Sequence, residues 1–255
     1  MTTLIVDADS FAYAAAVAAE TTVEWEPGQL SVSADADEAI AEVSRKLRNL
    51  KKELEADKLV LAISDASENG WRRKVYPKYK AHRKERKPLA LQAVRDFLLS
   101  KGAYLRPTLE ADDVCGILAT NSKIVPGPKI VVSIDKDLRT IPGRHFSPLK
   151  RDEGIVVVDA HEANYFHMMQ TLTGDVVDGY PGCPNIGPVK AKTILAETGI
   201  DFGKSYWDAV VETFEKKGLT ADDALVQARV ARILRASDYD FKQKKVRLWT
   251  PPQSS

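Results

Sequence analysis

The feature that most constrains the fold is a repeated pattern in which a short apolar run ends in an acidic residue and a helix-forming segment follows. The runs TLIV, KLVLAIS and KIVVSI are followed directly by Asp7, Asp65 and Asp135. Apolar runs that alternate with helical segments indicate a parallel sheet covered by helices on both faces. We therefore predict an α/β fold, with a mostly parallel central sheet flanked by helices.

The segments between these runs indicate where the helices lie. Apolar residues recur at spacings of three and four over 37–54, which predicts an amphipathic helix. Further helices are expected over 89–99, after the acidic group EADD, and from about 160 to 173. We also predict a hairpin around Pro27-Gly28 and a short strand at 103–105. The remainder is mostly helical, so we divide the chain into an α/β core over 1–160 and a helical part over 161–255 packed on it as one compact unit.

Composition says little about partners but constrains the environment. The 37 basic and 36 acidic residues leave a net charge of +1, so only the distribution of charge is informative. Cys115 and Cys183 show no CxxC spacing, as is typical of a reduced cytosolic protein. The apolar run FAYAAAVAA is too short to span a bilayer and lacks a basic leader. We expect a soluble intracellular protein with no membrane partner.

Acidic residues are predicted to gather at one edge of the sheet, because functional groups in such folds lie beyond the carboxyl ends of the strands. A crowd of carboxylates repels itself unless cations neutralise it, and oxygen ligands suit Mg²⁺ or Mn²⁺. Two such ions can support phosphodiester hydrolysis. The EADD group has a second explanation, since acids are also common in the first turn of a helix. The candidate ligands are Asp7, Asp65, Glu110, Asp112, Asp113, Asp135, Asp137, Asp175 and Asp178.

The segment 71–88, WRRKVYPKYKAHRKERKP, concentrates nine Lys or Arg residues with aromatic side chains between them. A phosphate backbone would be attracted there, and exposed aromatic rings can stack on unpaired bases. A solvated basic helix face is the simpler alternative. The candidate DNA contacts in this segment are Arg72, Arg73, Tyr76, Tyr79 and Lys84.

A second DNA contact is predicted in the glycine- and proline-rich break GYPGCPNIGPVKAKTIL. It precedes a helix that should begin near Pro188, a residue favoured in a first helical turn. The free backbone N–H groups of such a helix start can bind phosphate without reading base identity. Gly187, Lys190 and Lys192 are the candidate contacts.

Taken in order, the motifs IVDAD, YPKYKAHR, EADD, SIDKDL and GDVVDGYPGCPNIGPVKA resemble the 5′-nuclease superfamily, which includes phage 5′→3′ exonucleases and flap endonucleases. The resemblance spans roughly residues 4–195 and implies a PIN-like nuclease core. It implies that the nine acids above bind two metal ions, and that Lys80 and Arg83 contact the scissile phosphate from a basic arch or gateway. It further implies that Gly187 and Lys190 belong to a helix-three-turn-helix motif that grips duplex DNA and in relatives binds K⁺.

This chain departs from the family pattern at three positions. Gly179 follows the last motif aspartate where Asn is common, Asn185 replaces the first glycine of the Gly-Ile-Gly loop, and Val189 occupies a frequent lysine position. These departures concern the K⁺ site and the grip on duplex DNA. The length and the lack of a polymerase domain favour a phage-type exonuclease, which would act in the host cytoplasm.

The resemblance predicts a Mg²⁺-dependent 5′→3′ exonuclease on duplex DNA that also acts on RNA in RNA-DNA hybrids and on flaps, leaving 5′-phosphate products. Two alternatives remain from the sequence. One is a phosphatase in which Asp7 is the nucleophile and Asp9 the acid. The other is a non-catalytic DNA-binding protein, which the many carboxylates disfavour because they would repel DNA.

Overall fold

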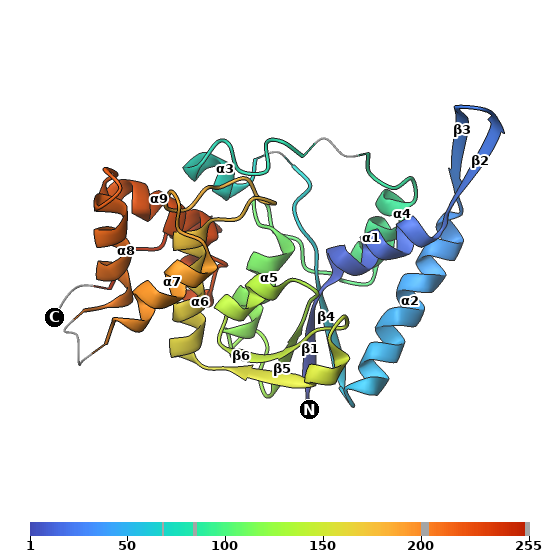
Figure 1. The fold of residues 1–255 in the computed structure, drawn as a ribbon. Helices are drawn as coiled ribbons and strands as arrows, with labels where there is room; N and C mark the ends of the chain where they lie inside the picture. The colour runs from blue at the N-terminus through green and yellow to red at the C-terminus, as the bar shows by residue number, and fades with distance from the viewer. Residues whose placement is uncertain (68, 84–85, 200–203, 253–255) are drawn as a thin grey trace.

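The computed structural model describes residues 1–67, 69–83, 86–199 and 204–252. Within them, β4 (Lys58–Ala62), β1 (Thr3–Asp7), β5 (Lys129–Val132), β6 (Gly143–Phe146) and β7 (Ile155–Val158) form a sheet in that order (Figure 1). Strand β1 runs parallel to both β4 and β5, and β5 runs parallel to β6. Only the edge pair β6–β7 is antiparallel in this sheet. The predicted α/β fold with a mostly parallel sheet is confirmed.

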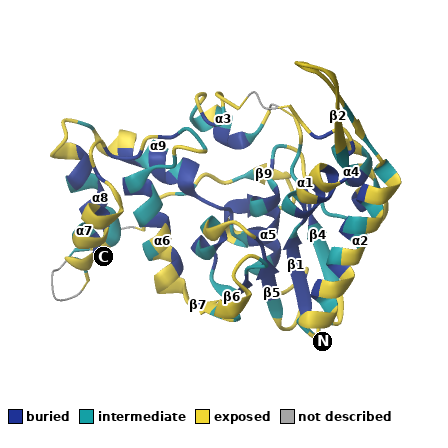
Figure 2. Cartoon of the chain, turned by 45° about the vertical axis from the view of Figure 1, so that its right-hand side comes forward, coloured by how far each residue is buried: buried dark blue, intermediate teal, exposed yellow. Residues whose placement is uncertain are grey.

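Helices cover both faces of the sheet because successive strand residues point to opposite sides. Leu4 and Val6 pack into one apolar cluster, and Ile5 between them packs into another. The first cluster is closed by α1 (Ala8–Ala18), α2 (Ala36–Glu53) and α4 (Leu91–Ser100), and the second by α5 (Ala111–Ala119). Figure 2 shows the central strands β1 and β5 as largely buried.

Helix α2 illustrates how the sequence dictates an element. Its side chains at Ala39, Val43, Leu47 and Leu50 are buried, which is the predicted three-four spacing. The Asp35 carboxylate accepts hydrogen bonds from the first free backbone N–H groups and so begins the helix. The helix predicted over 37–54 therefore lies within two residues of its expected bounds.

The C-terminal part is helical and has its own apolar cluster, centred on Leu172 and Phe214. Its helices are α6 (Ala160–Thr173), α7 (Pro188–Ala196), α8 (Tyr206–Glu215) and α9 (Ala221–Ala231). After α9 the chain returns to the core, where Ile233 and Leu234 pack with the α5 cluster. This return joins the helical part to the sheet.

Shorter elements complete the described residues. The hairpin of β2 (Glu20–Glu26) and β3 (Gln29–Ala34) matches the prediction and projects away from the body (Figure 1). The strand expected at 103–105 is reduced to a single bridge between Tyr104 and Ala62. The remaining elements are α3 (Trp71–Val75), η1 (Lys136–Thr140), η2 (Arg151–Glu153), η4 (Ala236–Asp238), β8 (Tyr239–Asp240) and β9 (Lys245–Val246).

Two findings bear on environment. Cys115 and Cys183 are both buried and carry free thiols. No helix in the described part of the chain is long and apolar enough to cross a membrane.

Candidate active site

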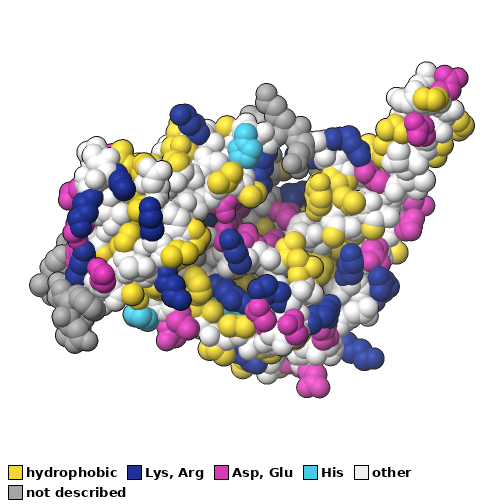
Figure 3. Space-filling view, viewed as in Figure 1, with side chains coloured by type: hydrophobic (Ala, Val, Ile, Leu, Met, Phe, Trp, Pro, Cys, Tyr) yellow, Lys and Arg dark blue, Asp and Glu magenta, His cyan; other side chains and the backbone are white. Residues whose placement is uncertain are grey.

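An acidic cleft lies beyond the carboxyl ends of the parallel strands. Its volume is about 590 Å³. Figure 3 shows acidic side chains in a hollow on this face, with lysine and arginine side chains around it. The predicted carboxylates that line the cleft are Asp7, Asp65, Glu110, Asp112, Asp135, Asp137 and Asp178. The fold thus brings together acids that are up to 171 positions apart in the chain.

The side of the cleft at β1 and β5 crowds its carboxylates. Ser133 Oγ donates a hydrogen bond to Asp7 Oδ2 at 3.0 Å and accepts one from the Asp135 backbone N–H at 3.0 Å. Burial and the charge of Asp9 raise the pKa of Asp7 to about 6. Burial and the charge of Asp135 raise the pKa of Asp137 to about 7. Each raised pKa reflects a carboxylate whose negative charge is poorly compensated.

Asp65, at the end of β4, is held differently. Its carboxylate accepts hydrogen bonds from the backbone N–H groups of Ser67 at 3.0 Å and Thr108 at 2.7 Å, and from Ser67 Oγ at 2.6 Å. These bonds outweigh burial and lower the pKa of Asp65. Asp65 is therefore ionised and oriented before any ligand arrives.

Asp113 does not fit the predicted role of a metal ligand. Its side chain is fully buried, and both of its oxygens accept hydrogen bonds from the Arg72 guanidinium, at 2.8 and 2.9 Å. Trp71 Nε1 donates to Oδ2 at 2.7 Å, and the Leu234 backbone N–H donates to Oδ1 at 3.1 Å. The sequence grouped Asp113 with its neighbours because spacing shows which helix face a residue occupies, but not what covers that face.

Arg72 and Tyr79, predicted as DNA contacts, are also buried, at 3% exposure each. Besides Asp113, the Arg72 guanidinium donates to the carbonyl oxygens of Val230 at 3.1 Å and Arg232 at 2.9 Å. The Tyr79 hydroxyl contacts the carboxylates of Glu110 and Asp178 at 3.0 and 2.8 Å. Both side chains are almost fully buried and their polar atoms are bonded within the protein, which disfavours the predicted DNA contacts. Their role is to join the basic segment to α5 and to the end of α9.

Lys80 and Arg83 line the cleft. Lys80 Nζ is 2.8 Å from Glu110 Oε2 and 3.6 Å from Asp178 Oδ2, and an Arg83 nitrogen is 2.7 Å from Asp178 Oδ1. Burial alone would lower the pKa of Lys80, but these carboxylates outweigh it and raise the pKa. The ammonium group is therefore protonated. Arg72 and Lys80 likewise outweigh burial at Glu110 and lower its pKa to about 2.

The basic segment is fastened to the loop that carries Asp178. The Lys80 backbone N–H donates to the Asp178 carbonyl oxygen at 2.8 Å. Next to it, Gly179 has φ of +74°, and a Cβ at that position would lie 3.0 Å from the His82 ring. Glycine and asparagine both tolerate positive φ. The departure from the family's Asn at this position thus preserves the backbone shape.

The remaining predicted contacts lie around the cleft. Arg73 and Tyr76 are half-buried, and Arg73 lines the cleft. Lys84 lies outside the described residues. Asp175 does not line the cleft; it lines a neighbouring cavity, and its Oδ1 accepts from the Val177 and Asp178 backbone N–H groups.

The predicted helix-three-turn-helix loop leads into α7, which begins at Pro188. Gly187 immediately precedes the helix and is exposed, as are Lys190 and Lys192. Asn185 adopts φ of +61°, a left-handed conformation that glycine would adopt without strain and that asparagine tolerates. Lys190 Nζ donates to the Asn185 carbonyl oxygen at 3.2 Å. The loop therefore keeps its turn despite its departure from Gly-Ile-Gly.

Sequence reasoning missed Arg95 and Ser133. The Arg95 guanidinium pairs with Asp9 and donates to the Ser64 carbonyl oxygen at 2.5 Å, while Asp9 Oδ2 also accepts from the Ser64 backbone N–H at 2.9 Å. A single arginine on an amphipathic helix carries no signal of this role. Ser133 could have been found, because it directly follows β5 on the way to Asp135.

The donor set of the cleft is made of oxygen atoms, as a hard divalent cation requires. Among the described residues, however, no three Asp, Glu, His or Cys side chains stand close enough together to ligate one ion. Binding would therefore require carboxylate side chains to rotate inward. The negative charges of Asp7 and Asp137 are poorly compensated, so a bound cation would be stabilised there.

Comparisons with known proteins identify the family to which the chain belongs. Residues 2–168 match the family model described as 5′-3′ exonuclease, N-terminal resolvase-like domain. The exonuclease of Escherichia phage T7 is 30% identical over 97% of this chain and 93% of its own length. Flap endonuclease Xni of Shewanella denitrificans is 33% identical over 53% of this chain and 58% of its own length.

Solved structures show the same fold. A phage T5 protein co-crystallised with metal ions has a TM-score of 0.64 at 15% identity and covers 91% of this chain and 89% of its own. A phage T5 5′-exonuclease with bound divalent metal ions has a TM-score of 0.58 at 16% identity, covering 91% of this chain and 93% of its own. Because the family model matches well over half of the residues, the chain belongs to the 5′-3′ exonuclease family of the 5′-nuclease superfamily and is a 5′→3′ nuclease.

Proposed function

We propose that this nuclease hydrolyses duplex DNA from 5′ ends in a reaction that requires two divalent metal ions, and that it leaves 5′-phosphate products. The observation that carries the proposal is one cleft in which acids from separate strand ends face Lys80 and Arg83. The names of the relatives, an exonuclease and a flap endonuclease, support it.

Mg²⁺ is the proposed ion, with Mn²⁺ able to replace it. When bound, such ions activate a water molecule and stabilise the leaving oxygen. Asp113 is left out of the proposed ligands because both of its oxygens are taken by Arg72, Trp71 and Leu234. The proposed ligands are Asp7, Asp65, Glu110, Asp112, Asp135, Asp137 and Asp178. Asp175 helps to position Asp178, because its Oδ1 accepts a hydrogen bond from the Asp178 backbone N–H.

Lys80 and Arg83 are proposed to contact the scissile phosphate. Lys80 is protonated and can bind negative charge, so it cannot serve as a general base. A cation fixed against developing negative charge stabilises the transition state without having to reorganise. The backbone at Lys80 is left-handed, with φ of +52°, and turns the segment at this point. The hydrogen bond from the Lys80 backbone N–H to the Asp178 carbonyl oxygen stabilises the turn.

The duplex is proposed to lie on the exposed start of α7, at Gly187, Lys190 and Lys192. Contacts of this kind reach phosphates rather than base edges, so we expect little sequence preference. For the same reason RNA-DNA hybrids and 5′ flaps are proposed as further substrates, with K⁺ bound at the loop before α7. The proposed place of action is the cytoplasm of a phage host.

The structure disfavours the phosphatase considered from the sequence. That reaction requires Asp9 as an acid beside Asp7. Asp9 is instead paired with Arg95 and accepts a hydrogen bond from the Ser64 backbone. Both oxygens of the Asp9 carboxylate therefore act as hydrogen-bond acceptors, which does not fit a residue that must donate a proton to a leaving group.

The experiment is a time course on duplex DNA labelled at the 5′ or the 3′ end, with Mg²⁺ and with EDTA. We expect early release of short 5′-labelled products and progressive shortening of the 3′-labelled strand, both in Mg²⁺ only. Asp135→Ala should abolish both. Duplex, hybrid and flap substrates that all stay intact in Mg²⁺ and in Mn²⁺, or full activity of Asp135→Ala, would refute the proposal.

A further inference from the structure

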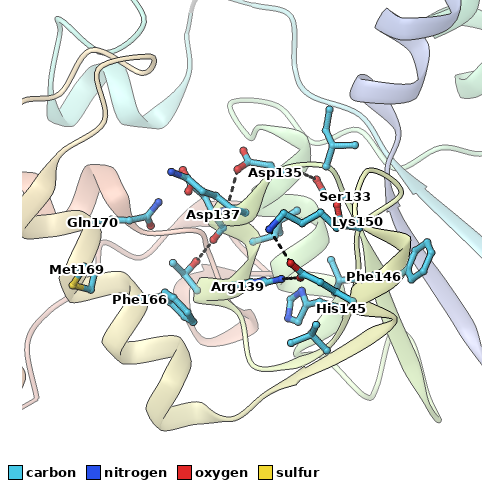
Figure 4. Close-up of a pocket in the computed structure, with 18 of the residues that line it drawn as sticks. Ser133, Asp135, Asp137, Arg139, His145, Phe146, Lys150, Phe166, Met169 and Gln170 are labelled. Atoms are coloured by element: carbon cyan, nitrogen blue, oxygen red, sulfur yellow. Dashed lines mark hydrogen bonds and ion pairs between the residues drawn. The ribbon is translucent and has the colours of Figure 1, made fainter. Parts of the chain in front are cut away.

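A second cavity lies beside the acidic cleft, between the carboxyl ends of β5 and β6 and helix α6 (Figure 4). Its volume is about 380 Å³, within the range of small-molecule sites. Asp135, Asp137 and Gln170 line both the cavity and the cleft. A molecule in the cavity would therefore lie next to the place where the nuclease cuts.

The cavity has apolar walls on two sides. Phe166 and Met169 come from α6, and Val131 and Val156 come from the sheet. Figure 4 shows the two α6 side chains together on one side of the cavity. A cavity lined by aromatic and branched aliphatic side chains suits a flat, weakly polar ring better than a free phosphate or a sugar.

Gln170 supplies an unpaired hydrogen-bond acceptor. Its Oε1 atom is buried and has no hydrogen-bond partner within the described part of the chain. Figure 4 shows the side chain extending from α6 over the cavity. A buried acceptor without a partner destabilises a protein, so turning the Gln170 amide toward the cavity to accept an N–H group from a ligand would be favourable.

Positive charge lies at another wall. An Arg139 nitrogen is 2.5 Å from Glu153 Oε2, and Lys150 Nζ is 2.9 Å from Glu153 Oε1. At this wall two cations share one carboxylate, so these three side chains together are positive, whereas Asp135, Asp137 and Asp175 line the cavity elsewhere. A phosphate group can accept hydrogen bonds from both cations.

We propose that this cavity binds a nucleoside 5′-monophosphate. The base lies between the apolar walls and donates an amino or ring N–H to Gln170, and the phosphate is bound by Arg139 and Lys150. The inference rests on the proposed function, because an exonuclease that leaves 5′-phosphates releases this class of product beside Asp135 and Asp137.

The test measures equilibrium binding by calorimetry, with the full chain in EDTA so that no cleavage occurs. The probes are dAMP, deoxyadenosine, and deoxyribose 5-phosphate, which lacks the base. We expect dAMP to bind most tightly of the three. Gln170→Leu should weaken dAMP binding about three- to tenfold, the usual effect of losing one hydrogen bond, and leave deoxyribose 5-phosphate unchanged. Phe166→Ala should act in the same way.

A matched control is Gln92→Leu, because Gln92 is exposed on α4 and its amide contacts only Asp96 among the described residues. It should change neither binding nor cleavage. Arg139→Gln should weaken both phosphate-containing probes and leave deoxyadenosine unchanged. Thermal melting of each variant confirms that it is folded.

The outcomes separate this inference from the proposed function. Cleavage of duplex DNA by a protein that binds no dAMP at millimolar concentration would overturn the nucleotide site and leave the function intact. Equal dAMP affinity in the wild type and in folded Gln170→Leu and Phe166→Ala would also overturn it. Selective dAMP binding without any cleavage would support the site and refute the function.

Discussion

The buried pair of Arg72 and Asp113 allows a structural aspartate to be distinguished from metal-binding ones on the same helix. Asp113→Ala removes the carboxylate that both guanidinium nitrogens contact at 2.8 and 2.9 Å, and it leaves Arg72 at 3% exposure. Removing one partner of a buried ion pair lowers the free energy of unfolding by about 3–5 kcal/mol. Trp71 and the backbone of Leu234 lose a partner in the same substitution.

Asp112→Ala, one residue earlier, is the matched control. Asp112 is 3.5 Å from Arg72 and its side chain is 22% exposed. Burial and the negative charges of Asp113 and Glu110 raise its pKa, so removing it relieves repulsion. We expect a much smaller loss of stability and a loss of Mg²⁺ affinity. Asp113→Ala should lose much more stability, and at temperatures where it stays folded it should keep the wild-type affinity for Mg²⁺.

The assay is urea unfolding followed by tryptophan fluorescence, with Mg²⁺ binding measured by calorimetry on the folded variants. With a slope of about 2 kcal/mol per molar urea, a loss of 3–5 kcal/mol lowers the midpoint by roughly 1.5–2.5 M. The reasoning is refuted if Asp113→Ala unfolds at the wild-type urea concentration and loses Mg²⁺ binding. Asp113 would then be a metal ligand, as its position in the sequence suggests.

Three further substitutions test other parts of the structure. Lys80→Met should lower kcat about 10²- to 10³-fold, whereas Lys123→Met, at an exposed position outside the cleft, should not; equal rates for the two variants would exclude Lys80 from the reaction. Burial, with help from Arg232, lowers the pKa of His167 from its ordinary 6.5 to about 3. The unfolded chain therefore takes up the proton first as pH falls, and stability present above pH 6.5 is lost toward pH 3 by up to about 1.4 kcal/mol per pH unit. Thermal melting at pH 7 and pH 5 should show that His167→Gln reduces this dependence, and an unchanged dependence would contradict the assignment. Gly182→Ala should unfold at a much lower temperature than wild type, because its Cβ would lie 2.3 Å from the Gly174 nitrogen. Gly187→Ala is the control and should melt as wild type does, because no atom lies within 4 Å of its Cβ. Equal melting temperatures of the two variants would contradict the close packing at Gly182.

Much of the fold could be predicted because local patterns decided it. The three-four spacing of α2 and the apolar runs of β1, β4 and β5 specify both the element and its buried face. The strand expected at 103–105 shows the limit of such reasoning. Tyr104 pairs with Ala62, the last residue of the edge strand β4, and this is the single bridge that the segment makes with the sheet. Strand formation there depends on a partner distant in the sequence, which local propensity does not describe.

The sequence predicts an acidic cleft at the sheet edge, but it does not predict which of the nearby side chains are buried. Carboxylates that follow the ends of parallel strands lie at one sheet edge, and Asp7, Asp65 and Asp135 accordingly line one cleft. Arg72 and Tyr79 lie in a segment that is basic and aromatic in composition, as DNA-binding segments are. Their burial comes from the end of α9, some 150 residues later, and composition carries no information about that contact.

The ion pairs of the cleft link the affinity for cations to the affinity for phosphate. Lys80 and Arg83 are held by Glu110 and Asp178. A divalent cation that engages those carboxylates leaves the two basic side chains without partners, and a phosphate can then take the vacated place. The two ligands therefore strengthen each other, and by linkage each must raise the affinity for the other by the same factor. Lys80→Met removes one of the two cations that can exchange a carboxylate for a phosphate. It should therefore make the affinity for DNA less dependent on Mg²⁺, and it should also lower the rate of cleavage.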